Sequence, residues 1–138
     1  MEINKIKETC LYVKDLNATR HFYESTLSFP VIGTRKGRHV FFRAGTSVLL
    51  CFIPEITKAE QELPPHYAIG PQHIAFEVPK EAYTAWKEKI TLAGVKIIHE
   101  QSWNDQLQSF YFHDPDGNLL EIIPEGMWDS RDTKIAPD

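Results

Sequence analysis

Two segments of the sequence place an ionisable side chain inside an otherwise apolar stretch of strand character. GPQHIAFEV contains His73, and DPDGNLLEII contains Glu121. Because a carboxylate in such surroundings loses hydration, it needs a partner or a metal ion nearby. Imidazole nitrogen and carboxylate oxygen are both ligands for divalent ions. The two residues therefore indicate either a metal site or a hydrogen-bonded His73–Glu121 pair without metal.

The alternation of side chains along the expected strands adds Glu8 to this pair. Successive side chains of a strand point to opposite faces, and here one face is apolar while the other mixes aromatic and ionisable residues. Glu8, His73 and Glu121 all fall on the mixed face. Three such ligands would leave open positions on Mn²⁺, Ni²⁺, Zn²⁺, Fe²⁺ or Mg²⁺. The mixed face suits the lining of a small-molecule cavity, and a dimer surface or a partly exposed sheet is the alternative.

Three further residues of the mixed face are candidates for contacts with a substrate. Tyr111 could donate a hydrogen bond to a bound oxyanion, and Arg43 or His39 could hold an anionic group. Packing in the cavity and a surface ion pair are the alternative roles of these residues.

Three other residues complete the substrate-binding candidates. His66 lies on a long loop, where it could reach a substrate as part of a lid or could simply be solvated. Trp103 could form part of the wall of the pocket. Cys10 lies near Glu8 on the same face and could touch the substrate, but it is not assigned as a nucleophile because no residue is clearly placed as its base.

The elements that position these residues occur twice in the same order. Apolar periodicity predicts a strand, a helix and three strands in each half of the chain. The expected elements are 6–13, 16–27, 31–34, 39–43 and 47–53 in the first half, and 72–78, 80–93, 95–100, 108–113 and 119–123 in the second. Residues 54–70 are expected to form a surface loop. Overlaying VLLCFIPE on NLLEIIPE places Cys51 opposite Glu121.

Length, charge and composition narrow the class of protein. A chain of 138 residues with a net charge of −4 and no basic run fits one domain without a nucleic-acid footprint. Its apolar runs are too short for a membrane span, and MEINKIKE lacks the features of a signal peptide. Two cysteines in apolar runs are expected to be reduced, which favours the cytoplasm. We expect a domain over 1–128, with modules at about 6–55 and 71–125, and a polar tail over 129–138.

Three segments resemble the vicinal-oxygen-chelate superfamily, which includes glyoxalase I, fosfomycin-resistance enzymes, extradiol dioxygenases and bleomycin-binding proteins. They are LYVKDLNATRHFYESTL, GPQHIAFEV and SFYFHDPDGNLLEIIPE, and DPDGN followed by Glu is the most specific part. The resemblance implies an α+β fold in which two βαβββ modules form a curled mixed sheet around a central cavity. It also implies a divalent metal ion, a small substrate chelated through two neighbouring oxygens, and a homodimer.

The metal ligands of the superfamily can be placed on this chain one by one. His73 matches the ligand on the fifth strand and Glu121 the ligand on the eighth, while Glu8 stands where many members carry His and some glyoxalases Gln. The fourth glyoxalase ligand, a Glu on the fourth strand, would fall near Leu50 or Cys51 and is missing. The implied site is a Glu/His/Glu set, harder and more anionic than the 2-His-1-carboxylate set of iron dioxygenases.

The implied function is a metal-dependent glyoxalase-like enzyme that uses Lewis-acid chemistry on a small vicinal-oxygen substrate. It would be a lyase, an isomerase or a thiol transferase. Glu8 or Glu121 would act as the base, and Tyr111 would act as the hydrogen-bond donor. An extradiol-type dioxygenase is one alternative. The other is a non-catalytic protein that binds a drug or metabolite without metal.

Overall fold

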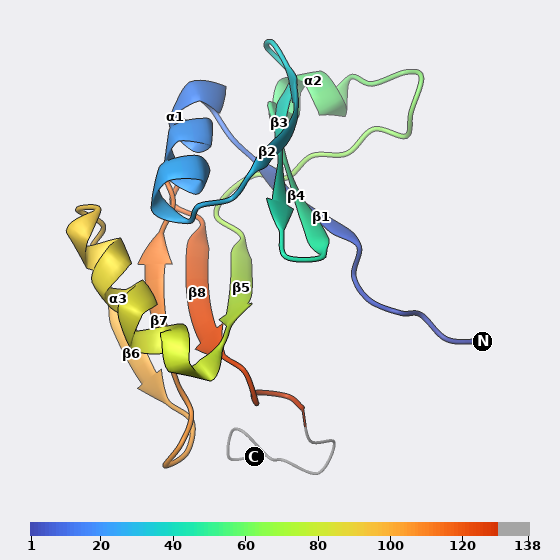
Figure 1. The fold of residues 1–138 in the computed structure, drawn as a ribbon. Helices are drawn as coiled ribbons and strands as arrows, with labels where there is room; N and C mark the ends of the chain where they lie inside the picture. Colours follow the sequence, from blue (N-terminus) through green and yellow to red (C-terminus); the bar gives the residue numbers. More distant parts are fainter. Residues whose placement is uncertain (130–138) are drawn as a thin grey trace. The chain divides into compact units, whose positions relative to one another are not determined.

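The computed structural model describes residues 1–129. The chain divides into two compact units, Met1–Gly70 and Pro71–Asp138, each of which folds as a strand, a helical segment and three strands (Figure 1). Of the polar tail expected at 129–138, only Asp129 lies within the described residues. Over residues 1–129, every helix is too short or too polar to cross a lipid bilayer.

The first unit is a four-stranded mixed sheet in the order β1-β4-β3-β2. The β1 and β4 strands run parallel, and the other two pairs are antiparallel. Its elements are β1 (Glu8–Tyr12), α1 (Leu16–His21), the π-helical turn η1 (Phe22–Thr26), β2 (Val31–Arg35), β3 (His39–Ala44), β4 (Ser47–Phe52) and α2 (Pro54–Lys58).

The second unit repeats this topology in the strand order β5-β8-β7-β6, again with one parallel pair, β5 with β8. Its elements are β5 (His73–Val78), the 3₁₀ turn η2 (Lys80–Ala82), α3 (Tyr83–Leu92), β6 (His99–Ser102), β7 (Gln108–His113) and β8 (Leu119–Pro124). The prediction of an α+β fold built from two βαβββ modules with mixed sheets is confirmed. Each four-stranded sheet stays open and does not close into a barrel.

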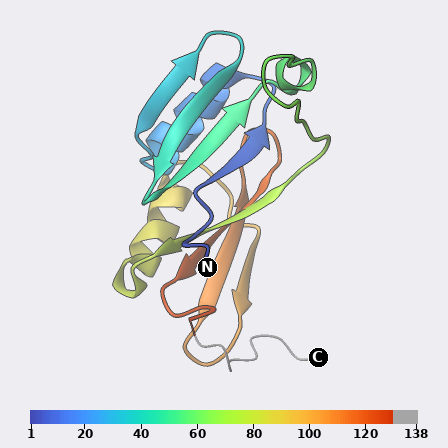
Figure 2. The same ribbon diagram turned by 90° about the vertical axis from the view of Figure 1, so that its right-hand side faces the viewer.

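In each unit a helix covers one face of the sheet and buries the apolar side chains of that face. In the first unit α1 contacts β3 and β4, and Figure 2 shows it behind the four strands. The ring of Tyr23 packs 5.3 Å from that of Phe42, and both are fully buried. In the second unit α3 contacts β8, and Tyr83 packs edge-on against the buried Phe110. The opposite face of each sheet, here called the helix-free face, carries the mixed residues predicted from alternation.

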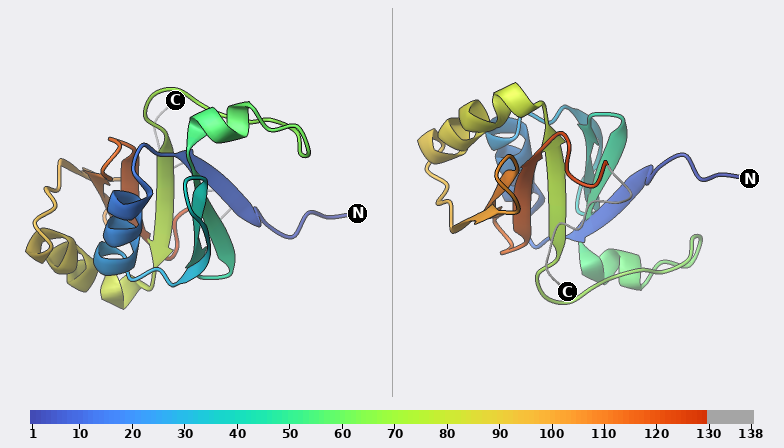
Figure 3. Two further views of the ribbon diagram at one scale, coloured as in Figure 1. Left: turned by 90° about the horizontal axis from the view of Figure 1, so that it is seen from above. Right: turned by 90° about the horizontal axis from the view of Figure 1, so that it is seen from below.

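Three elements differ from the expected ones. The segment expected as a loop over 54–70 begins with α2, because Pro54 occupies the first turn, where a missing N–H costs nothing, with Glu55 beside it and Lys58 in the last turn. The rest of that segment is an extended loop (Figure 3). The strand expected at 95–100 is His99–Ser102, because its register with β7 is set by the hairpin that Trp103 closes with Leu107. The helix expected over 16–27 changes to a π turn at Phe22.

The expected equivalence of Cys51 with Glu121 is wrong by one residue. Glu8 pairs with Val48 across the parallel strands of the first unit, as His73 pairs with Leu119 in the second. Counting from these pairs, the counterpart of Glu121 is Leu50. Cys51 is fully buried on the helix-covered face, where it pairs with Leu11. The overlay of similar letters missed this because a shift of one residue moves a side chain to the other face of a strand.

Candidate metal centre

His73 and Glu121 lie side by side on the helix-free face of the second sheet. The Nε2 atom of His73 lies 3.3 Å from Oε2 of Glu121. The carboxylate side chain is 8% exposed and the imidazole 49% exposed, so a ligand can approach the buried carboxylate from the side of the ring. The predicted pair is therefore brought together by the parallel strands β5 and β8 within one unit.

A backbone carbonyl determines which nitrogen of His73 faces Glu121. Nδ1 lies 2.9 Å from the carbonyl oxygen of Leu119. Because a carbonyl only accepts hydrogen bonds, Nδ1 carries a proton, and in the neutral ring Nε2 then presents its lone pair. Nε2 and the carboxylate of Glu121 are both electron-rich in that state. The two groups therefore repel each other at this distance unless a proton or a cation lies between them.

This arrangement fits a divalent metal ion. Ligands held about 2.1 Å from one ion lie roughly 3.0–3.4 Å apart in octahedral or tetrahedral geometry, and the observed spacing is 3.3 Å. Imidazoles that bind metal usually donate their other N–H to a carbonyl or carboxylate, as His73 does. Within neither unit, over residues 1–129, do three His, Cys, Asp or Glu side chains gather around one point. His73 and Glu121 thus supply two donors from the second unit.

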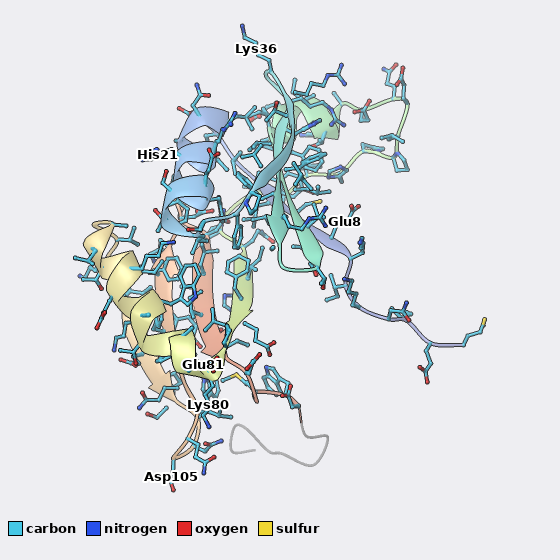
Figure 4. The ribbon with its side chains drawn as sticks, in the orientation of Figure 1. Glu8, His21, Lys36, Lys80, Glu81 and Asp105 are labelled. Atoms are coloured by element: carbon cyan, nitrogen blue, oxygen red, sulfur yellow. The ribbon has the colours of Figure 1, made fainter. Side chains whose placement is uncertain are left out.

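Glu8 occupies in the first unit the register position that His73 occupies in the second. It is exposed at the start of β1, where the N-terminal segment joins the sheet (Figure 4). Its partner in β4 is Val48, and the next residue of β1 on the helix-free face, Cys10, pairs with Leu50. The first unit therefore presents one candidate ligand at this level of the sheet, because Leu50 replaces the second carboxylate.

Tyr111 pairs with Glu121 across β7 and β8 on the helix-free face. Its ring also lies 6.2 Å from the ring of His73. Burial and, after it, the carboxylate of Glu121 raise the pKa of the phenol, while Ser109 opposes them. The hydroxyl therefore stays protonated at neutral pH and can act as a hydrogen-bond donor beside the His73–Glu121 pair.

Cys10 remains a thiol in this environment. Burial, followed by the negative charge of Glu8, raises the pKa of Cys10. Since the thiolate is the nucleophilic form, a raised pKa makes Cys10 a poor nucleophile. Cys10 and Cys51 are not joined by a disulfide bond.

Comparisons with known proteins agree with the two-unit fold. Residues 5–122 match the Glyoxalase/Bleomycin resistance protein/Dioxygenase superfamily. The chain belongs to this superfamily.

Relatives within the superfamily share most of the length of this chain. The metallothiol transferase FosB of Bacillus licheniformis is 28% identical over 94% of this chain and 82% of its own. A crystal structure of lactoylglutathione lyase from Agrobacterium tumefaciens is 28% identical, with a TM-score of 0.89 over 94% of this chain and all of its own. A mutant of the fosfomycin resistance protein FosX from Listeria monocytogenes, solved with Mn(II) and 1S,2S-dihydroxypropylphosphonic acid, is 25% identical, with a TM-score of 0.67 over 88% of this chain and 90% of its own.

His39 belongs to an aromatic cluster on the helix-free face of the first sheet. Its ring stacks on Phe41 at 4.0 Å and meets Phe52 edge-on at 5.8 Å. The guanidinium of Arg38 lies 2.8 Å from its Nδ1 and also forms an ion pair of 2.9 Å with Glu60. Sequence reasoning named His39 but missed Arg38 and Glu60, because their contact joins a hairpin to a distant loop.

We expect His39 to titrate below the ordinary histidine value of about 6.5. Burial, then Arg38 and then Arg35, lower its pKa. The unfolded chain therefore binds a proton more readily than the folded one, so folding stability falls as the pH drops below about 6.5. An NMR titration of the imidazole checks this expectation, and Arg35→Gln should raise the midpoint partway. A midpoint at or above the ordinary value would contradict the buried, positively charged setting.

His66 is fixed to the sheet by its side chain. Its Nδ1 lies 2.7 Å from the hydroxyl of Tyr12, and its ring packs edge-on against Phe52 at 4.9 Å. Its backbone N–H donates to the carbonyl of Thr57. The loop histidine is thus half-buried rather than simply solvated, and Tyr12 is a helix-free-face residue that sequence reasoning had not singled out.

The two remaining substrate-binding candidates lie in different units. Arg43 is half-buried on the helix-free face of the first sheet and pairs with Val48 in β4. Trp103 belongs to the second unit, where its indole N–H donates to the hydroxyl of Ser109 at 2.9 Å. The Trp103 ring packs against a small apolar cluster that contains Leu107 and Met127. This packing gives Trp103 a structural role in the loop that joins β6 and β7.

Proposed function

We propose that the chain is a divalent-metal-dependent enzyme with glyoxalase-like chemistry on a small substrate that carries two neighbouring oxygens. The observation that carries the proposal is the 3.3 Å approach of His73 Nε2 to Glu121 Oε2, with His73 Nδ1 bonded to a carbonyl. Glu8 is proposed as the third ligand. The ion would be Mn²⁺, Ni²⁺, Zn²⁺, Fe²⁺ or Mg²⁺; carboxylate oxygen suits Mn²⁺ and Mg²⁺, and imidazole nitrogen suits Ni²⁺, Zn²⁺ and Fe²⁺.

The residues around the pair have distinct roles in this proposal. A bound divalent ion supplies Lewis acidity, which stabilises negative charge on a substrate oxygen. Tyr111 donates a hydrogen bond to that oxygen, since its raised pKa keeps the phenol protonated. Glu121 or Glu8 accepts the proton that the substrate loses. Cys10 remains a neutral thiol that contacts the substrate without attacking it.

The named relatives support non-redox chemistry that involves a thiol. FosB is a metallothiol transferase and the Agrobacterium protein a lactoylglutathione lyase, and both are 28% identical to this chain. The FosX structure contains Mn(II). We therefore propose a lyase, isomerase or thiol transferase that acts as a homodimer in the cytoplasm. Two carboxylates and one imidazole also suit a Lewis acid better than they suit oxygen activation.

The decisive experiment loads untagged protein with each of the five ions and assays three reactions. The substrates are the hemithioacetal of methylglyoxal and a thiol, a small epoxide with a thiol, and catechol with oxygen. We expect metal-dependent turnover of one of the two thiol-linked substrates and no oxygen uptake. Oxygen uptake with ferrous iron and catechol would replace the proposal by a dioxygenase. Failure to bind any of the five ions would replace it by a metal-free binding protein.

A further inference from the structure

A groove of about 570 Å³ lies in the first unit, at the end of the sheet away from Glu8. Its volume is within the range of small-molecule sites, about 300–1,000 Å³. Lys14 lines it and stands six positions after Glu8 in the chain, a distance of about 20 Å in extended conformation at 3.3 Å per residue. All lining residues belong to the first unit; they are Lys14, Asp15, Leu16, Asn17, Arg20, Thr34, Arg35, Lys36, Gly37, His39, Val40 and Ile53.

Positive charge dominates the lining of the groove, although the chain as a whole carries a net charge of −4. Its cations come from four places: Lys14 from the segment after β1, Arg20 from α1, Arg35 from β2 and Lys36 from the tip of the β2–β3 hairpin (Figure 4). Because they come from separate elements, the fold itself gathers them around one space. The lowered pKa of His39, to which Arg35 contributes, agrees with a positive potential there.

The acidic groups near the groove already have partners. Asp15, the one acidic residue among those that line it, accepts hydrogen bonds from the backbone N–H groups of Asn17 and Ala18 as the N-cap of α1. Arg20 forms an exposed ion pair of 3.1 Å with Glu24 on the same helix. An exposed pair of this kind contributes little, so an incoming anion competes with it at low cost.

The groove also has an apolar portion. Leu16, Val40 and Ile53 line it, and Val40 is almost fully buried in the sheet beneath α1. Apolar surface between cationic groups favours a ligand with a compact apolar body and an anionic end over an inorganic ion. Several cations from separate elements favour a dianion over a single carboxylate.

We propose that this groove binds a small organic phosphate, with its phosphate between Lys14 and Arg35 and its apolar body over Leu16 and Ile53. The groove lies at the other end of the first sheet from Glu8, and its proposed ligand does not depend on the proposed metal chemistry. Arg20 and Lys36 stand at its rim and add to the attraction.

The test is an NMR titration of the full chain with phenyl phosphate, with inorganic phosphate as the comparison probe. We expect shifts at Thr34, Gly37 and the His39 ring, and weaker binding of inorganic phosphate. Lys14→Gln and Arg35→Gln should each weaken binding of phenyl phosphate roughly tenfold, the loss expected for one charge-assisted hydrogen bond. The matched control is Lys80→Gln, which removes one exposed positive charge from the second unit and should bind like the wild type.

Each contrary result excludes part of the proposal. If Lys14→Gln and Arg35→Gln bind phenyl phosphate as Lys80→Gln does, the groove is not the site. If His73→Ala abolishes binding, the phosphate binds at the candidate metal centre instead. Equal affinity for the two probes would overturn the assignment to an organic phosphate. If the wild-type protein binds phenyl phosphate but none of the five metal ions, the proposed function is overturned and the phosphate site is not.

Discussion

His73→Ala is expected to abolish stoichiometric binding of a divalent metal by this chain. Removal of the imidazole leaves Glu121 as the single donor of the second unit at this position. Loss of a second-shell partner typically costs 10–100-fold in metal affinity, and loss of a direct ligand costs more, so we expect a decrease of roughly a thousandfold. Elemental analysis of untagged protein after reconstitution, with calorimetric titration of Mn²⁺, measures the effect.

His113→Ala is the matched control for this prediction. His113 is exposed on the helix-free face of β7 and flanks Leu119 on the side opposite His73. The substitution removes an imidazole from the same helix-free face as His73→Ala does, and it should leave the metal content unchanged. If the control loses metal while His73→Ala retains it, the centre has been assigned to the wrong histidine. Glu8→Gln tests the proposal that Glu8 is a third ligand, and retention of full affinity would contradict that proposal.

The fold could be predicted largely from local patterns, because in each unit a helix covers one face of the sheet and buries its apolar side chains. The alternation that separated Leu11 from Cys10, and Phe110 from Tyr111, reports this burial directly. What local patterns could not determine was register across strands. Cys51 was set against Glu121 because the letters around them are similar, whereas the backbone pairs place Leu50 there.

The candidate site could be predicted where one strand supplies the signal and not where distant segments meet. His73 and Glu121 each interrupt an apolar strand, so each stands out in the sequence. The contact of His66 with Tyr12 joins segments 54 residues apart, and that of Arg38 with Glu60 joins segments 22 residues apart. No local pattern in the sequence predicts either contact. The groove around Lys14 was missed for the same reason, since its cations are spread over four elements.

The turn before β8 is connected to the start of β5 by a chain of hydrogen bonds. Asn118 donates from its side chain and its backbone to the carboxylate of Asp114, each at 2.9 Å. Its side-chain oxygen accepts from the backbone N–H of Gln72 at 2.9 Å, and the carbonyl of Gln72 accepts from Leu119. Both Asn118 and Asp114 are buried. The turn thereby ties the start of β5 to the start of β8, where His73 contacts the carbonyl of Leu119.

Asn118→Ala is therefore expected to lower both stability and metal affinity. The substitution removes the side-chain N–H that donates to Oδ2 of the buried Asp114, and the side-chain oxygen that accepts from the part-buried N–H of Gln72. Loss of a buried hydrogen-bond partner costs about 1–3 kcal/mol, so we expect a loss of about 3 kcal/mol in the free energy of unfolding. Metal affinity should fall roughly 10–100-fold, the range for a group that orients a ligand. Urea unfolding and calorimetric titration of the folded variant measure the two effects separately.

Asn104→Ala provides the matched control, because Asn104 also organises a turn through its side-chain oxygen. That oxygen accepts from the backbone N–H groups of Gln106 and Leu107 in the loop between β6 and β7, and the residue is exposed. Asn104→Ala should cost less stability and should leave metal affinity intact, since these two side-chain hydrogen bonds stay within the loop between β6 and β7. If both variants weaken metal binding equally, the effect comes from general loosening of the second unit. If Asn118→Ala loses stability but keeps full affinity, the turn holds the fold without positioning His73.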